Sequence, residues 1–151
     1  MKFAYIDMNK IKLRISGDEV VEKIEFVKDV KDIKTPNHLE NAQKQIEEYL
    51  LGQREIFDFD FEITGTDFQV DVWNALLEIP YGETRSYKDI AIAIGNPDAS
   101  RAVGNANNRN PLPIVIPCHR VIGANKKLTG YAGGIDIKKQ LLELESRKKD
   151  A

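Results

Sequence analysis

The chain has 151 residues, of which 42% are hydrophobic and 30% charged, enough for one compact core or two small domains sharing an interface. Its single cysteine excludes an intramolecular disulfide and a zinc site built from several cysteines, and indicates a reducing, cytoplasmic setting. The sequence shows no signal-peptide pattern and no apolar run near the roughly 18 residues that span a bilayer, so no membrane partner is expected.

The formal net charge of −2 does not exclude DNA as a partner, because the charges are divided unevenly along the chain. Residues 1–66 hold 10 basic and 14 acidic side chains, whereas residues 81–131 hold 7 basic and 3 acidic ones. A locally basic surface is sufficient to follow a phosphate backbone. The acidic first part argues only against strong non-specific binding at high salt.

The first third of the chain predicts a small α+β domain. Segments of partly alternating polarity, separated by turn signals, predict a three-stranded antiparallel meander over residues 3–8, 11–15 and 20–27. A helix is expected over 38–51, with a cap at 35–37 and Gly52 at its end. Three phenylalanines then alternate with acidic residues, which predicts a strand over 57–61 with one solvent-facing side.

A boundary at Thr64-Gly65 divides the chain into an N-terminal α+β domain, residues 1–63, and a mostly helical C-terminal domain, residues 64–151. A capping box of Thr66 and Gln69 opens a helix over 67–78. A second helix over 86–94 stops at Gly95, and a third starts at Asn96-Pro97. The last two predict a helix-turn-helix of winged-helix-like type, within an overall α/β (α+β) fold.

The third helix has an apolar stripe of small residues, formed by Ala99, Ala102, Val103 and Ala106. Arg101 lies almost opposite this stripe, on a face of small polar residues. An ordinary surface helix would show the same pattern. Gly104 favours a binding role, because a glycine inside a helix costs about 1 kcal/mol against alanine and is useful where another backbone approaches closely.

Two prolines end the helical pattern before a short apolar segment, residues 114–116, which predicts a buried strand leading to Pro117-Cys118. A glycine-rich loop over 123–134 follows and carries Tyr131. A last helix begins near Asp136, and its basic end at residues 147–149 suits the helix dipole.

Cys118 is the candidate nucleophile of the chain. An ordinary thiol is only a few per cent ionised at neutral pH, so it needs a base or a cation, and His119 and Arg120 offer both. Neighbours in an extended segment point to opposite sides, so His119 reaches Cys118 only through a turn or a water. Glu145 borders the apolar face of the last helix and can orient a base. Taken singly, the cysteine also fits an inert core position, and the glutamate fits an exposed one.

Several motifs in order, over roughly residues 66 to 146, resemble the O6-alkylguanine-DNA alkyltransferases, or methylated-DNA–protein-cysteine methyltransferases. The motifs are Tyr81-Gly82-Glu83, Ser86-Tyr87, Arg101-Ala102-Val103-Gly104, the segment 110–116, Pro117-Cys118-His119-Arg120-Val121 and Tyr131-Ala132-Gly133-Gly134. The first third of the chain resembles the family only in its plan of strands and helix.

The resemblance implies a catalytic set made of Cys118, His119, Glu145 and Tyr131. It implies that Cys118 attacks the alkyl carbon on guanine O6, or on O4 of thymine, and that His119 takes the thiol proton through a water while Glu145 holds the histidine. Tyr131 is expected to donate to the leaving oxygen or to N3 of the purine. The thioether left on Cys118 cannot be cleaved by any residue here, so the protein acts once.

The resemblance also implies minor-groove binding to duplex DNA and flipping of the alkylated base. Arg101 is expected to fill the vacated stack, Tyr87 to help rotate the 3′ phosphate, and Ala102 and Gly104 to allow close approach of the helix. Asn110 is the implied hinge between this helix and the active-site segment. Residues implied to line the base pocket are Val121, Ala132 and Gly133, with backbone carbonyls near Cys118 and Val121 reading the guanine amino group.

One position departs from part of the family, and three other functions remain as alternatives. Some members carry a serine where this chain has Ala132, and a backbone donor is the replacement for that hydroxyl.

An alkyltransferase-like protein would lack the cysteine; a helix-turn-helix regulator would bind the major groove as a dimer; a cysteine hydrolase would turn over and need an oxyanion hole. The expected protein is a monomer that uses neither a cofactor nor a metal ion.

Overall fold

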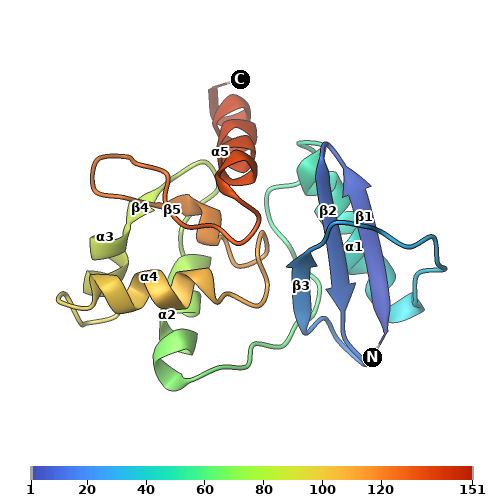
Figure 1. Ribbon diagram of the computed structural model, residues 1–151, viewed down its shortest axis with the longest axis horizontal. Coiled ribbons are helices and arrows are strands. Elements are labelled where there is room, and N and C mark those ends of the chain that lie inside the picture. Colours follow the sequence, from blue (N-terminus) through green and yellow to red (C-terminus); the bar gives the residue numbers. More distant parts are fainter. Residues whose placement is uncertain (1, 151) are drawn as a thin grey trace. The chain divides into compact units, whose positions relative to one another are not determined.

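The computed structural model describes residues 2–150 and the side chains of residues 2–147 (Figure 1). The chain forms two compact units, Met1–Ile63 and Thr64–Ala151. The first unit contains an antiparallel sheet and a helix, and the second consists mainly of helices, which confirms the mixed α/β class.

The first unit is built on a meander of three antiparallel strands in the order β1-β2-β3, with bounds β1 Phe3–Met8, β2 Ile11–Ser16 and β3 Lys23–Phe26. Asn9 and Lys10 make the first turn with positive φ angles of 53° and 68°, as a tight hairpin requires. The helix α1, Asn37–Leu50, contacts β1 and β2 and buries Leu39, Ala42, Ile46 and Tyr49. The predicted meander and helix are confirmed, although β3 is shorter than expected and no side chain at 35–37 caps α1.

The strand expected over 57–61 is wrong, and a buried glutamine explains why. Gln45 of α1 accepts a hydrogen bond from the Asp58 backbone N–H at 3.0 Å and donates to the Asp58 carboxylate. A side chain therefore takes the backbone group that a neighbouring strand would have used. The segment makes a single bridge between Phe61 and Val21, and its phenylalanine rings pack edge to face with centroids about 6 Å apart.

In the second unit, capping boxes set the starts of the first two helices, one of them predicted from the sequence and one not. Helix α2, Asp67–Leu77, begins at the Thr66–Gln69 capping box, and α3, Tyr87–Ala93, begins at a second box formed by Ser86 and Asp89. Trp73 is buried in α2 and donates from its ring N–H to the Ala106 carbonyl at 2.9 Å. This bond fixes α2 against α4, Ser100–Asn108.

Helix α4 starts later than the sequence predicted. The expected start at Asn96-Pro97 is wrong, because Asn96 to Ala99 form a turn closed by the Ala99 N–H and the Asn96 carbonyl at 3.0 Å. Ala102 was expected in the buried stripe, but it is exposed beside Arg101. The buried side of α4 is made by Val103, Ala106 and Asn107.

The segment that leads to the cysteine is a turn rather than the predicted strand. Ile114 has a φ of 77°, and the Ile116 N–H donates to the Leu112 carbonyl at 2.8 Å. Asn110 closes the turn, because its side chain accepts from the Leu112 N–H at 2.9 Å and donates to the Ile116 carbonyl at 2.7 Å. The segment is buried as expected, but Asn110 satisfies the groups that would otherwise pair with a strand.

After this turn, the chain forms a short 3₁₀ helix, η1 Cys118–Arg120, and the two-residue strand β5, Val121–Ile122. Strand β5 pairs in parallel with β4, Arg85–Ser86, which directly precedes α3. The last helix, α5 Ile135–Asp150, packs on η1. The side chains of Lys148 and Lys149, part of the expected basic end, lie outside the described residues. Within residues 2–150, no helix has the length and apolarity to cross a membrane.

Candidate active site

Cys118 occupies the first position of η1 and is nearly buried, with 4% of its surface exposed. Its carbonyl accepts from the Val121 N–H and, at 3.4 Å, from the side chain of Asn107 on α4. Burial raises the pKa of the thiol to about 11, and a hydrogen bond from the Asn110 side chain opposes this rise. The thiol is therefore neutral at rest at pH 7.

His119 follows in the same 3₁₀ turn and is fully buried against α5. Its Nε2 lies 2.7 Å from Oε2 of Glu145, which is itself only 1% exposed. The chain is not extended here, because a 3₁₀ turn, one of the two alternatives that the sequence left open, carries both Cys118 and His119. With Nε2 engaged by the carboxylate, the other ring nitrogen, Nδ1, is the atom that can take a proton.

Glu145 also binds Arg120, so one carboxylate holds two neighbouring residues of η1. Arg120 donates from Nε to Oε1 at 2.8 Å and from Nη2 to Oε2 at 3.0 Å. The Gly82 N–H donates to Oε1 at 3.2 Å, and a third guanidinium bond goes from Arg120 Nη1 to the Ile79 carbonyl at 2.7 Å. Arg120 therefore serves as the counter-charge of Glu145, whereas the cation that lowers the pKa of the Cys118 thiol is Lys138.

Burial and neighbouring charges determine the protonation states of Glu145 and His119. Burial alone would raise the pKa of Glu145, but hydrogen bonds and charge from His119 and Arg120 outweigh it and hold that pKa well below the usual range. Burial lowers the pKa of His119, and the charges of Arg120 and Lys138 act in the same direction, against the opposing effect of Glu145. The arrangement presents an ionised carboxylate and a neutral imidazole at neutral pH.

Tyr131 and the loop around it lie close to this group. The tyrosine is partly exposed, but its hydroxyl is buried. Burial, followed by the charges of Cys118 and Glu145, raises the pKa of this hydroxyl well above its usual value, so Tyr131 remains a donor. Ala132 is exposed and Gly133 is half-buried in the same loop, whereas Val121 is fully buried in β5.

Sequence reasoning missed two buried polar residues beside the cysteine. Lys138 of α5 is 0% exposed, and its Nζ donates to the Val121 carbonyl at 2.6 Å and to the Thr129 carbonyl at 2.7 Å. Asn107 donates to the Cys118 carbonyl from α4. A signal for Lys138 was present, because it precedes Glu145 by seven residues and therefore shares its helix face. Asn107 could not be singled out from the sequence, because it lies among other polar residues at the end of α4.

Of the DNA-contact residues expected from the resemblance, Tyr87 lies on α3, Arg101, Ala102 and Gly104 lie on α4, and Asn110 follows α4. Arg101 and Ala102 are exposed on α4. Tyr87 opens α3, and its hydroxyl lies 3.0 Å from the Thr129 hydroxyl. A methyl group on Gly104 would meet the Tyr87 ring at 3.8 Å, an ordinary contact, so the protein itself leaves room for a side chain there.

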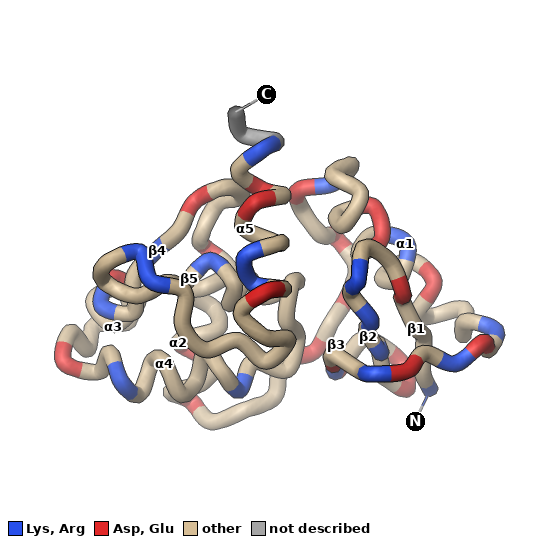
Figure 2. Tube along the Cα trace, turned by 45° about the horizontal axis from the view of Figure 1, so that its top comes forward, with Lys and Arg blue, Asp and Glu red and all other residues tan. Residues whose placement is uncertain are grey.

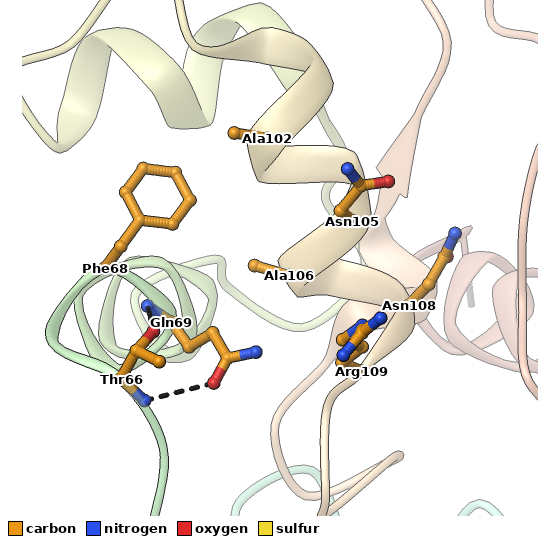
Figure 3. A pocket seen from close by; sticks show the side chains of 8 residues that line it. All are labelled: Thr66, Phe68, Gln69, Ala102, Asn105, Ala106, Asn108 and Arg109. Atoms are coloured by element: carbon orange, nitrogen blue, oxygen red, sulfur yellow. Dashed lines mark hydrogen bonds between the residues drawn. The ribbon is translucent and has the colours of Figure 1, made fainter.

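A hollow of about 460 Å³ lies between the start of α2 and the outer face of α4 (Figure 3). The residues that line it are Thr66, Phe68, Gln69, Ala102, Asn105, Ala106, Asn108 and Arg109. The hollow is thus lined in part by the exposed residues Ala102, Asn105 and Asn108 of α4. Figure 2 shows basic positions on α3, on α4 and on the loop after β5, whereas the first unit carries many acidic ones. Among residues with described side chains, no three His, Cys, Asp or Glu residues cluster as metal ligands would.

Comparison with known proteins shows which family the chain is similar to. Residues 67–147 match the model described as 6-O-methylguanine DNA methyltransferase, DNA binding domain. The methylated-DNA–protein-cysteine methyltransferase of Methanosarcina acetivorans is 55% identical over 139 residues, covering 87% of this chain and 89% of that protein. The constitutive enzyme of Bacillus subtilis is 51% identical over 135 residues, covering 89% and 81%. Mycobacterium tuberculosis OGT in complex with DNA has a TM-score of 0.88 at 46% identity, covering 97% of this chain and 93% of that one.

Proposed function

Because the chain belongs to the methylated-DNA–protein-cysteine methyltransferase family, we propose that it repairs DNA by moving an alkyl group from guanine O6, or thymine O4, to its own Cys118. The observation that carries this proposal is the buried thiol at the start of a turn whose next residue, His119, is held by Glu145 at 2.7 Å. Mycobacterium tuberculosis OGT has been solved with DNA, which supports duplex DNA as the partner.

The reaction first requires removal of the thiol proton, since the thiol has a pKa of about 11. Neutral His119 accepts this proton at Nδ1 through a bridging water, and Glu145 stabilises the imidazolium that results. The Cys118 sulfur then forms a bond to the alkyl carbon as the bond between that carbon and O6 breaks. The proton removed from the thiol balances the one that the released guanine takes up.

Tyr131 stabilises the leaving base. Its hydroxyl stays protonated because its pKa is raised, so it can donate to O6 or N3 as negative charge develops on the purine. Ala132 and Gly133 follow in the same loop, where a backbone N–H takes the place of a serine hydroxyl. The product on Cys118 is a thioether, which a histidine and a carboxylate cannot hydrolyse, so each protein molecule reacts once.

The burial of Cys118 requires the base to leave the duplex. A stacked base cannot reach a thiol that is 4% exposed, so the nucleotide is flipped into the pocket. Helices α3 and α4 act as a helix-turn-helix that enters the minor groove, with Ala102 and Gly104 allowing close approach and Arg101 filling the stack. Tyr87 helps to rotate the 3′ phosphate, and Asn110 links α4 to the turn before Cys118.

These roles assign the second unit to DNA binding and alkyl transfer and leave the first as its support. The base pocket ends at Val121, whose carbonyl accepts from the guanine amino group. A thiol that must stay reduced and a DNA substrate both favour the cytoplasm as the site of action. We also propose that the protein works as a monomer, since the groups named here all come from one chain.

The proposed function is tested by separating binding from transfer. Cys118→Ala should bind duplex DNA containing O6-methylguanine as tightly as the wild type and transfer nothing. Arg101→Ala should react with the free O6-substituted base at the wild-type rate, but repair duplex DNA at least tenfold more slowly, because only flipping is impaired. Transfer by Cys118→Ala, measured with a labelled methyl group, would refute the assignment.

A further inference from the structure

Lys138 is a buried cation that the proposed chemistry does not use. It comes from α5 and is fully shielded from solvent, yet its ammonium group bonds to backbone carbonyls rather than to a carboxylate. Burial lowers its pKa to about 8, and interaction with Cys118 opposes this. An apolar side chain of similar volume would fill the space without the cost of desolvating a charge. Packing alone therefore does not explain a lysine here.

The two carbonyls that Lys138 binds belong to two separate segments, which would form two walls of the proposed base pocket. Val121 lies in β5, directly after the η1 turn that carries Cys118. Thr129 lies in the loop two residues before Tyr131, and its hydroxyl is 3.0 Å from the Tyr87 hydroxyl. At 2.6 and 2.7 Å, both lysine bonds are short, as expected for charge-assisted hydrogen bonds. One ammonium group thus fixes the spacing between the two walls.

Two carbonyls are expected to accept a hydrogen bond from the guanine amino group, and the Val121 carbonyl has the greater remaining capacity to do so. The Cys118 carbonyl already accepts two N–H groups, from Val121 and Asn107, and a carbonyl oxygen has two lone pairs. The Val121 carbonyl has a second lone pair beside the one that Lys138 engages. Recognition of the amino group therefore depends on the direction in which Lys138 holds this oxygen.

We propose that Lys138 is a specificity-determining positioning residue, which aims the Val121 carbonyl at the guanine 2-amino group while anchoring the loop that carries Tyr131. It acts through these backbone groups and not on the reacting atoms. The inference rests on the proposed function, since it concerns the base taken up by the same pocket. It predicts that loss of Lys138 weakens discrimination for guanine more than it weakens transfer in general.

The test compares two bases in the same duplex: O6-methylguanine, and O6-methylhypoxanthine, which lacks the 2-amino group. Single-turnover rate constants are measured at saturating protein for the wild type, Lys138→Met and the matched control Lys139→Met, whose lysine is exposed on the same helix. We expect the wild type and the control to prefer guanine. In Lys138→Met the ratio of the two rate constants should fall about fivefold or more, as expected when one hydrogen bond is lost.

An unchanged ratio in Lys138→Met, including a loss of rate that is equal for both bases, would overturn the proposal and leave Lys138 a structural residue. A wild type without preference for guanine would overturn it as well. A wild type that transfers from neither base would refute the proposed function itself, so the two failures are distinguishable. Should Lys138→Met not fold, Lys138→Leu, which also removes the donor, gives the same comparison.

Discussion

At the scale of single residues, the surroundings of Cys118 keep its thiol protonated. The thiol is buried and its pKa is raised to about 11, whereas an exposed reactive cysteine would have a lowered pKa. His119 is neutral because burial lowers its pKa. The proposed mechanism therefore requires proton transfer from Cys118 to His119 in the complex with DNA, and a neutral thiol should react slowly with other alkylating agents in the free protein.

The histidine gives the reaction a defined pH dependence. In the proposed mechanism only neutral His119 accepts the thiol proton, and the pKa of His119 lies below the ordinary value of 6.5. The single-turnover rate should therefore stay level between pH 7.5 and 6.5 and fall only at lower pH, by about tenfold per unit once His119 is protonated. His119→Gln should be slow throughout and lack this acid limb. A decline that begins above pH 6.5 would contradict the lowered pKa.

Gly104 tests whether α4 approaches DNA closely. Inside the protein, a methyl group at this position meets only the Tyr87 ring at 3.8 Å, so Gly104→Ala should stabilise the fold by up to about 1 kcal/mol through better helix propensity. The same methyl group should weaken DNA binding, because it occupies the space needed by the minor-groove wall. Thermal unfolding and DNA titration measure the two effects. Unchanged DNA affinity in the variant would remove the close-approach role.

Residues were predictable from sequence where their type and spacing carried information. Cys118 and His119 stand out as a rare pair, and the position of Glu145 on the apolar border of its helix follows from periodicity. Lys138 was missed because a lysine is normally exposed, and nothing in a single sequence shows that backbone carbonyls will surround it. Asn107 was missed for the same reason, since its partner is a carbonyl created by the fold.

At the scale of elements, one side chain of α5 anchors the active-site turn. Glu145 binds His119 and Arg120 of η1, and it also accepts from the Gly82 N–H between α2 and β4. Three segments distant in sequence are thereby joined at a single carboxylate. Because the carboxylate and guanidinium are both buried, removal of one charge leaves the other uncompensated.

Glu145→Gln should therefore impair stability and transfer together. We expect the free energy of unfolding to fall by about 3–5 kcal/mol, since the Arg120 charge stays buried without its partner. Transfer should also slow, because the imidazolium of His119 loses its stabilising charge. Glu143→Gln is the matched control, an exposed position on the same helix that should change stability by less than about 0.5 kcal/mol. Equal denaturant midpoints for the two variants would contradict this anchor role.

Element boundaries were predictable where local side chains determine them, and were wrong where distant side chains intervene. The capping box at Thr66 set the start of α2 as expected. The segments 57–61 and 114–116 have strand-like sequences, but Gln45 and Asn110 occupy backbone groups that strand pairing would need. Such bonds depend on tertiary structure, so local periodicity cannot reveal them.

At the scale of the whole molecule, the two units differ in what they contribute. The family match at residues 67–147 lies within the second unit, which contains the proposed catalytic residues, α3 and α4. Similarity to the Methanosarcina protein extends over 87% of the chain and so reaches into the first unit as well. Residues 1–66 carry more acidic than basic side chains, so the surplus of basic charge lies in the second unit, which contacts DNA in our proposal. The acidic first unit should weaken non-specific binding to phosphate.

The central claim is that the whole protein is consumed when Cys118 takes the alkyl group. Its most direct test is mass spectrometry of the peptide that contains Cys118, after incubation with an excess of duplex DNA carrying O6-methylguanine. We predict a mass increase of one methyl group in place of one hydrogen on that peptide, and one repaired base per protein molecule. An unmodified Cys118 peptide alongside repaired DNA, or many repaired bases per protein, would contradict the claim.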